Sequence, residues 1–323
     1  MRLVLGAAIA ALLVAAGPGS DAATTAAGRI AFSLDRDGIS RIYSIRPDGT
    51  GLRLMTRPTL PQALGGDSGP DWSPNGRRLV FERDLPYWGQ DRISLYVVGA
   101  AGGRGRDLTA GPFDVMPTWS PDGRRIAFAH VSVAKSTASL VELDTLDGSL
   151  RSLTADAVDL TPAWSPDGGT IAFARFPGTE ANGADAQLFL VDAAGASARP
   201  IATSPINGVA PAWSPDGERI AFVSFRDHNG ISCGGDACYP NGEIYVVNAD
   251  GSGLTRLTTS KADDEHPTWS PDGRRIAFSS GYEFRRDGHP PWLMVISAEG
   301  GRARRVGRLS SVYDPAWSPA SVR

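Results

Sequence analysis

The sequence predicts an all-β fold, a six-bladed β-propeller of four-stranded antiparallel blades. The first observation is a Trp-Ser-Pro triplet that recurs six times at intervals of about 45 to 56 residues. The second is that each repeat contains four short strand patterns separated by turns, and no long segment of helical period follows residue 27. Repeats of this length and content are typical of propeller blades. The triplets begin at Trp72, Trp119, Trp164, Trp213, Trp269 and Trp317.

The first strand of each repeat ends at the tryptophan and leads into a Ser-Pro-Asp-Gly turn. Proline presets φ for the first central position of a type I turn, and Asp suits the next, where Asn75 stands in the first full repeat. Glycine then takes the left-handed conformation that closes a hairpin. We therefore expect each tryptophan on the innermost strand of a blade, packed between neighbouring blades.

The other three strands follow in a fixed order. In the repeat that begins at Trp213 they are Ile220–Phe222, Ile244–Val247 and Thr255–Thr258. Residues 28–56 supply the second, third and fourth strands of a repeat that has no first strand, and Tyr313–Pro319 supply a first strand alone. We expect the N-terminal strands to pair with the C-terminal strand in one shared blade, which closes the ring and removes exposed edges.

The N-terminal 27 residues predict a signal peptide and a short flexible leader. Arg2 gives a positive start, Leu3–Ala16 is an apolar run, and small residues follow to Ala27. This run is too short to span a bilayer comfortably, so we expect no integral membrane segment after signal removal. The predicted organisation is therefore 1–27 as leader and 28–323 as propeller, in a periplasmic or secreted protein. In such a compartment Cys233 and Cys238 are expected to form a disulfide.

Charge and motifs exclude several functions. The net charge is -3, and the sequence has no basic stripe of the kind that nucleic-acid binding needs. We assign no catalytic residue and no cofactor. The partner classes left open are a protein, a peptide or an envelope polymer, bound by a monomer.

Candidate binding residues gather on one face of the predicted propeller. We call it the upper face, the side with the loops from strand two to three and from strand four to the next blade. Loops on a rigid scaffold commonly carry function. An aspartate also stands five positions before the tryptophan in four repeats, near the expected channel mouth. The candidates are Asp67, Asp114, Asp159, Asp264, Glu265, His266, Tyr313, Asp314, Tyr87, Trp88 and Tyr282.

The four recurring aspartates allow two interpretations. They could form a carboxylate ring that holds a divalent cation or a basic group of a partner, which makes Asp67, Asp114, Asp159 and Asp264 the metal candidates. They could instead make local turns in which each side chain accepts backbone N–H groups before the proline. The second interpretation is favoured because such turns are common.

The Pro-x-Trp-Ser-Pro-Asp-Gly repeat, present six times with small variations, resembles the TolB-like β-propeller repeat family from about Gly28 to the end. Similar repeats form the propeller domains of prolyl-oligopeptidase-type peptidases. Because the first expected strand follows the leader, we expect the propeller without the N-terminal domain of TolB. The resemblance implies a binding scaffold that uses its upper face and channel. The alternative is a metal-assisted lyase or hydrolase that acts on a carbohydrate or lactone at the channel mouth.

Overall fold

The computed structural model describes most of the chain between Gly28 and Ala320. The described ranges are 28–36, 38–57, 66–85, 92–155, 157–178, 185–195, 197–202, 204–227, 231–234, 237–281 and 290–320. The predicted signal peptide and the candidates Tyr87, Trp88 and Tyr282 lie outside these residues.

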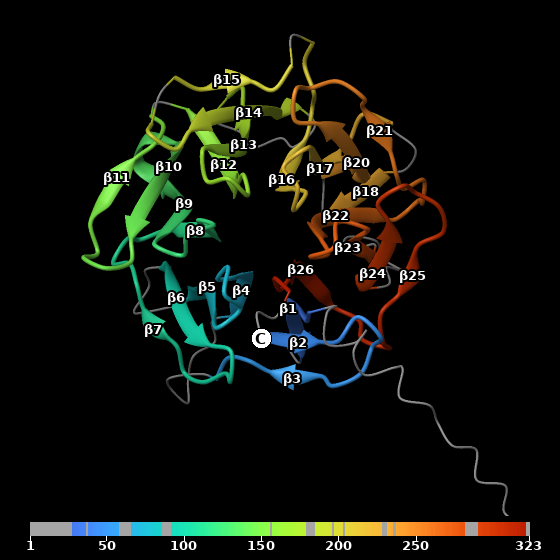
Figure 1. Ribbon diagram of the computed structural model, residues 1–323, viewed down its shortest axis with the longest axis horizontal. Helices are drawn as coiled ribbons and strands as arrows, with labels where there is room; N and C mark the ends of the chain where they lie inside the picture. The colour runs from blue at the N-terminus through green and yellow to red at the C-terminus, as the bar shows by residue number, and fades with distance from the viewer. Residues whose placement is uncertain are drawn as a thin grey trace, which may run out of the picture.

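The strands form antiparallel sheets set around a central axis (Figure 1). The first full repeat forms one sheet, β4 (Asp67–Trp72), β5 (Arg78–Asp84), β6 (Ile93–Gly99) and β7 (Arg106–Asp107). Next come β8 (Asp114–Trp119), β9 (Arg125–Ser132), β10 (Thr137–Asp144) and β11 (Leu150–Ser152), with a 3₁₀ turn at Val133–Lys135. They are followed by β12 (Val158–Trp164), β13 (Thr170–Phe176), β14 (Gln187–Asp192) and β15 (Arg199–Pro200).

The second half of the chain repeats the pattern. One sheet contains β16 (Val209–Trp213), β17 (Arg219–Ser224), β20 (Glu243–Asn248) and β21 (Thr255–Arg256). Another contains β22 (Asp263–Trp269), β23 (Arg275–Gly281), β24 (Trp292–Ser297) and β25 (Arg304–Arg305). A small hairpin, β18 (Ile231–Gly234) and β19 (Ala237–Pro240), pairs Cys233 with Cys238 in backbone register. The disulfide between them remains a prediction.

The sheet count differs from the expected six separate blades. Hydrogen bonding gives four separate four-stranded sheets and one eight-stranded sheet, which unites the repeats of β8–β11 and β12–β15. The union is a single parallel bridge between Ala138 and Val158, supported by the Ala138 N–H donating to Ala157 O at 3.0 Å. The equivalent bridge in the preceding repeat, between Ile93 and Phe113, does not join its sheets, because Phe113 lies just before β8 whereas Val158 is the first residue of β12.

Closure by the two ends of the chain is confirmed. The last strand, β26 (Val312–Trp317), pairs antiparallel with β1 (Ile30–Arg36), and the sheet continues through β2 (Ile39–Ile45) and β3 (Arg53–Leu54). The register places Ile30 opposite Trp317. The Arg29 N–H donates to Ser318 Oγ at 2.8 Å. This hydrogen bond joins the two ends of the chain at the place where the other repeats have a continuous turn.

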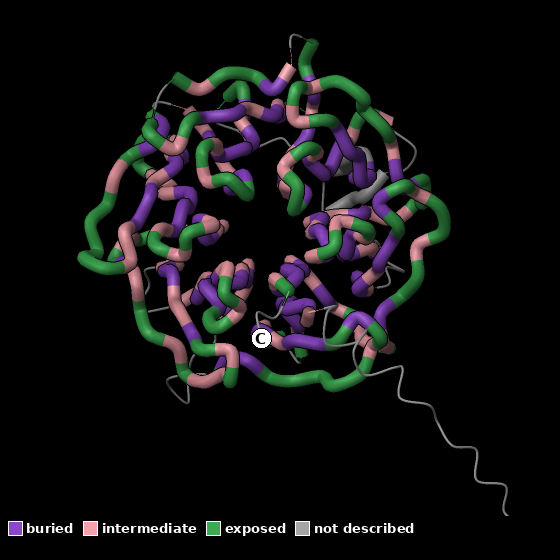
Figure 2. Tube along the Cα trace, viewed as in Figure 1, coloured by how far each residue is buried: buried purple, intermediate pink, exposed green. Residues whose placement is uncertain are grey.

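Tryptophans pack at the contacts between successive sheets, as predicted. Trp72 lies in one apolar cluster with Ala31 and Ile42 of the preceding sheet, and all three are buried. Figure 2 shows buried residues along the strands, with exposed residues mainly on the outer rim and on the turns around the channel. Arginines from the second strand add to several contacts, because a guanidinium over an indole face is attracted to its π-system. Arg125 lies 4.8 Å from the ring of Trp164, and two further pairs are Arg219 with Trp269 and Arg275 with Trp317.

The Ser-Pro-Asp-Gly turns have the predicted mechanism. In the turn after Trp119, the Gly123 N–H donates to Ser120 O at 2.9 Å, and Gly123 has a φ of 69°. Ser120 Oγ also accepts the Arg125 N–H at 2.9 Å. These turns end the innermost strands on the face opposite the upper face. Within the described part of the chain, no helix is both long and apolar enough to cross a membrane.

Candidate binding site in the axial channel

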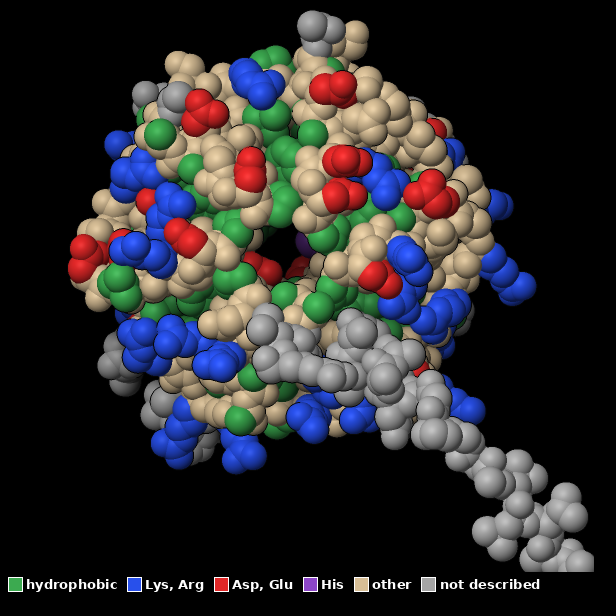
Figure 3. All heavy atoms as spheres, in the orientation of Figure 1, with side chains coloured by type: hydrophobic (Ala, Val, Ile, Leu, Met, Phe, Trp, Pro, Cys, Tyr) green, Lys and Arg blue, Asp and Glu red, His purple; other side chains and the backbone are tan. Residues whose placement is uncertain are grey.

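A cavity of about 660 Å³ occupies the axis of the propeller. Its wall consists of the six innermost strands and the turns that follow them, down to prolines such as Pro74 and Pro271. The opening is visible at the centre of Figure 3, with acidic side chains inside it. The cavity therefore reaches the face of the Ser-Pro turns.

Each innermost strand places one residue with a left-handed backbone conformation on the cavity wall. Every first strand contains a register shift two to three residues before the tryptophan, as between Val115 and Thr118 in β8. The residue that precedes the proline there has a positive φ, between 49° and 56°. A bulge of this kind re-aims the local side chain. The six residues line the cavity and are Gly69, Met116, Thr161, Ala210, His266 and Asp314.

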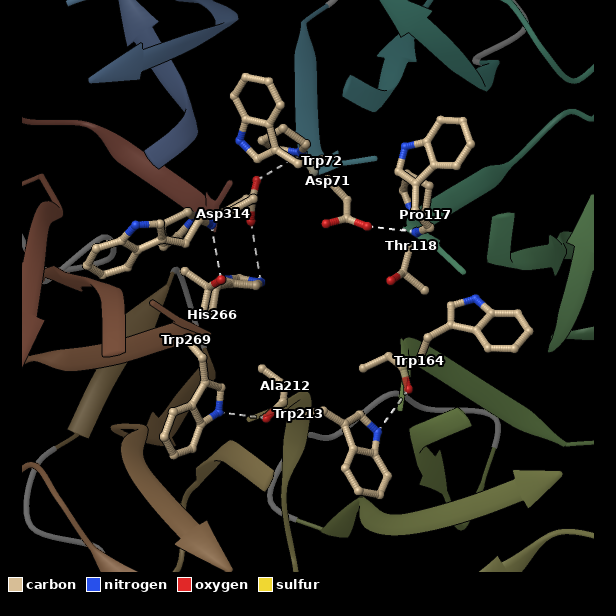
Figure 4. Close-up of a pocket in the computed structure, with 18 of the residues that line it drawn as sticks. Asp71, Trp72, Pro117, Thr118, Trp164, Ala212, Trp213, His266, Trp269 and Asp314 are labelled. Carbon is tan, nitrogen blue, oxygen red and sulfur yellow. Dashed lines mark hydrogen bonds and ion pairs between the residues drawn. The ribbon is translucent and has the colours of Figure 1, made fainter. Parts of the chain in front are cut away.

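One part of the wall carries charge. His266 Nε2 of β22 lies 3.4 Å from Asp314 Oδ1 of β26, and Figure 4 shows the two side chains pointing toward one another. Asp314 Oδ2 accepts hydrogen bonds from Ser33 Oγ at 3.1 Å and from the Gly69 N–H at 3.3 Å. The carboxylate therefore links three strands and leaves one side facing the imidazole.

Glu82 of β5 adds a second acid to this wall. Its Oε1 accepts the Met116 N–H at 2.7 Å, and its Oε2 accepts Ser68 Oγ at 3.3 Å. Burial raises the pKa of Glu82 to about 7, and the nearby charge of Asp314 acts in the same direction. Glu82 therefore exchanges a proton near neutral pH.

Asp71 of β4 is the fourth titratable side chain that lines the cavity, with Glu82, His266 and Asp314. Its Oδ2 accepts the Trp119 N–H at 2.7 Å, which fastens one innermost strand to the next (Figure 4). Burial raises the pKa of Asp71 to about 6.

The remaining wall is apolar or neutral. Met116, Thr161 and Ala210 stand at the position before the proline in their strands. Thr161 Oγ1 accepts the Ala210 N–H at 3.2 Å. A ligand in the cavity would thus meet carboxyl groups and an imidazole on one side and apolar surface on the other. Concave, mostly apolar sites with few polar groups are typical of ligand binding.

The four recurring aspartates lie elsewhere, which corrects the expectation that they approach the channel mouth. Each is buried and stands directly opposite a polar side chain of the second strand, in the same register position. Because side chains alternate between faces and the bulge lies between aspartate and tryptophan, these side chains point into the sheets. The pairs are Asp67 with Arg83, Asp114 with His130, Asp159 with Arg175, and Asp264 with Ser280.

Asp264 differs from the other three because its opposite residue carries no charge. Ser280 Oγ and Ser260 Oγ donate to it, at 2.5 Å and 3.2 Å. Burial raises the pKa of Asp264 to about 7, and the charge of Glu243 adds to the effect.

The metal candidates do not come together. They belong to separate repeats, and the described residues contain no group of three or more His, Cys, Asp or Glu that could hold a metal ion. The contacts of Asp67, Asp114 and Asp159 are with side chains of the second strand, whereas Asp264 also accepts a local hydrogen bond from Ser260.

Two of the predicted residues, His266 and Asp314, line the cavity. Glu265 and Tyr313 flank them in sequence and are half-buried, but they are not among the lining residues. Sequence reasoning missed Glu82, Asp71 and Met116. The signal that could have found Met116 is the position before the proline, because it varies in every repeat of an otherwise regular motif.

Fold and site together define a β-propeller with a ligand-sized axial cavity. The comparisons then specify the family. The model of the TolB beta propeller domain matches residues 19–182, 113–232 and 160–322, so the chain belongs to the TolB beta-propeller family.

The chain is similar to several known proteins of this kind. It is 35% identical over 77 residues to the uncharacterized peptidase YuxL of Bacillus subtilis, a match covering 24% of this chain and 11% of that protein. It is 35% identical over 79 residues to Tol-Pal system protein TolB 1 of Novosphingobium aromaticivorans, covering 24% of this chain and 17% of that protein. The matches thus span less than a fifth of these curated relatives.

A solved structure shows the same fold. TolB from Acinetobacter baumannii superposes with a TM-score of 0.68 at 18% identity, covering 90% of this chain and 67% of that chain.

Proposed function

We propose that this protein is a binding module that accepts a polypeptide segment or small ligand into its axial channel. The observation that carries the proposal is the cavity of about 660 Å³ with one charged wall, formed by Glu82, His266 and Asp314. Membership of the TolB beta-propeller family supports a binding scaffold over an enzyme. Rigid strands hold the site, so little conformational entropy is lost when a ligand enters.

The wall chemistry favours a ligand with a hydrogen-bond donor or a positive charge. Asp314 attracts such a group, and Glu82 accepts it more strongly once deprotonated. The apolar surface at Met116 and Ala210 suits an aliphatic or aromatic part of the same ligand.

We also infer that the eight-stranded sheet acts as two units, which makes six units around the channel. One bridge joins its halves, each half keeps its own four strands, and each contributes its own tryptophan to the wall. A single bridge contributes little compared with the apolar contacts that join every pair of successive sheets.

The location that we propose is outside the cytoplasm. The positive start, the apolar run and the small residues of the first 27 positions support a signal peptide. Expression in a bacterial host with an active export pathway, followed by mass measurement of the product, tests this. Loss of the first 27 residues or fewer supports the proposal, and an intact Met1 contradicts it.

Selection of peptides from a randomised display library tests channel binding. The matched variants are Ala210→Trp, which places an indole in the cavity, and Leu150→Trp on an exposed outer strand. We expect enriched peptides to contain Lys or Arg, to lose binding to A210W, and to bind L150W like the unmodified protein. Equal binding to both variants would contradict the channel as the site. Turnover of a carbohydrate or lactone that requires an added divalent cation would favour the alternative enzyme instead.

A further inference from the structure

An arginine cluster lies in the shared blade, and its side chains do not line the channel. It consists of Arg29 before β1, Arg46 after β2 and Arg53 in β3. Blue side chains gather over β3 in Figure 3. Arg304 of the adjacent sheet approaches the same turn, with its Nη2 donating to Pro47 O at 3.3 Å.

The repeat architecture shows what an equivalent pair of arginines binds elsewhere in the chain. In the β8–β11 repeat, the Glu142 carboxylate lies between Arg125 Nη1 at 3.3 Å and Arg151 Nη2 at 3.1 Å. An internal anion therefore neutralises both guanidinium groups, and such charge-assisted contacts suit the planar arginine fork.

The registers align the two repeats residue by residue. Ala127, Glu142 and Arg151 stand side by side across three strands, as do Ala31, Ser44 and Arg53 in the shared blade. Ser44 thus replaces Glu142, and Arg53 occupies the position of Arg151. Arg46 further replaces Asp144, so two acidic positions of one repeat are neutral or basic in the other.

The local contacts fix Arg29 and leave part of it available. Its Nε donates to Ser44 Oγ at 3.0 Å, and its Nη2 donates to Ser44 O at 2.9 Å and also to Gly51 O, which leaves Nη1. A Cβ built on Gly51 would lie 3.7 Å from Arg29 Nη1 and 3.0 Å from Arg46 Nη1. Both guanidinium groups therefore flank the open side of one exposed glycine. Burial, together with the charges of Arg53 and Arg46, lowers the pKa of Arg29.

Few acids offset this charge. Among the described residues, Arg29, Arg46 and Arg53 form no ion pair within 4.0 Å. Asp48 lies in the turn after Arg46, and its Oδ1 accepts the Thr50 N–H at 2.8 Å and the Thr50 hydroxyl at 2.7 Å. Its charge acts on Arg46, but three guanidinium groups still face one carboxylate.

We propose that the arginine cluster binds a phosphate group, which takes the place that the Glu142 carboxylate occupies between Arg125 and Arg151. Arginine forks match the oxygens of phosphate bidentately, and the exposed Gly51 places no side chain between Arg29 and Arg46. The phosphate can be free or can belong to a lipid headgroup, and the same contacts serve both.

Calorimetric titration with inorganic phosphate, at constant ionic strength set with chloride, tests the site. We expect saturable binding to the unmodified protein and about tenfold weaker binding to Arg53→Gln and Arg46→Gln, since each removes one charge-assisted contact. The matched control is Arg106→Gln, which holds the position of Arg53 in the next sheet and should bind like the unmodified protein. No saturable binding, or equal binding by R53Q and R106Q, would overturn the proposal.

A second variant supplies the missing anion from within. Ser44→Glu recreates the Glu142 arrangement, so it should abolish phosphate binding and lower the unfolding temperature little. Phosphate binding by folded S44E at the unmodified affinity would contradict the proposed position, and R53Q carries the test if S44E does not fold.

Vesicles distinguish the two sources of phosphate. Binding to phosphatidylglycerol vesicles that R53Q loses and R106Q keeps identifies a headgroup. Phosphate binding without vesicle binding identifies a soluble phosphate, and vesicle binding unaffected by R53Q contradicts a headgroup at this site.

Discussion

Replacing Trp317 by alanine tests whether the closed ring contributes to stability in solution. Trp317 ends β26, is 7% exposed, and lies in one apolar cluster with Ile30 of β1 and Val295 of β24. Arg275 of the preceding sheet lies 5.1 Å from its ring. The side chain therefore joins the last strand both to the first strand and to the neighbouring sheet.

The expected loss follows from these contacts. Truncation of a buried tryptophan costs about 3 to 5 kcal/mol, and the lost contact with the guanidinium adds about 0.5 to 2 kcal/mol. Trp164 is the matched position within the chain, 6% exposed and 4.8 Å from Arg125. If closure is complete, W317A and W164A should lose similar free energies of unfolding, within about 1 kcal/mol of each other.

Equilibrium unfolding in urea measures both losses. Leu254→Ala, at a side chain that is 38% exposed, is the control and should change the free energy of unfolding by less than about 0.5 kcal/mol. Amide hydrogen exchange gives a second readout, because β1 and β26 should lose protection together in W317A. A W317A loss below about 1 kcal/mol, beside a full loss for W164A, would refute the closed ring.

Three further predictions concern the channel wall, a buried ion pair and two glycines. Because burial raises the pKa of Glu82 from 4.5 to about 7, the folded protein holds a proton between these values that the unfolded chain has released, so stability falls as pH rises from 4.5 to 7. Urea unfolding at pH 4 and pH 8 should find E82Q equal to the unmodified protein at pH 4 and more stable at pH 8 by at most about 3 kcal/mol; parallel curves would contradict the raised pKa. Arg83→Ala should cost about 3 to 5 kcal/mol because it leaves Asp67 buried without its partner at 2.7 Å, and the added D67N change should recover part of this in thermal unfolding; no recovery would argue against the ion pair as the cause. Gly208→Ala should destabilise by at least about 1 kcal/mol, since its Cβ would lie 2.3 Å from a buried phenylalanine ring, whereas Gly99→Ala, with no atom within 4 Å, should change stability little; equal calorimetric midpoints would contradict the close packing.

Much of the fold could be predicted from the sequence because each repeat states the same local rules. The Ser-Pro-Asp-Gly turn and the strand after it are each determined by residues near one another in the chain. The shared blade could be predicted because the strands missing from one end of the chain are present at the other. The fusion of two repeats into one sheet could not be predicted, because it depends on whether the next innermost strand begins at the bridged residue, as β12 does at Val158 and β8 does not at Phe113. Such an edge contact carries no sequence motif.

The site was harder to predict than the fold because the bulge in each innermost strand changes which residues face the channel. The sequence analysis placed Asp67 and Asp114 near the channel mouth, yet each is buried against a side chain of the second strand. One inserted residue exchanges the two faces of a strand. His266 and Asp314 stand at the bulge itself, next to residues that the sequence analysis had already selected. Glu82 also lines the cavity but lies on the second strand, outside the selected positions.

The pairing of β26 with β1 also sets the order of events during biosynthesis. Strand β1 is made first and must wait for β26, made nearly 300 residues later, before its inner edge is covered. A protein that stops short of Val312 would leave this edge and the cavity wall open. The axial cavity is thus completed last, only after synthesis has passed that strand.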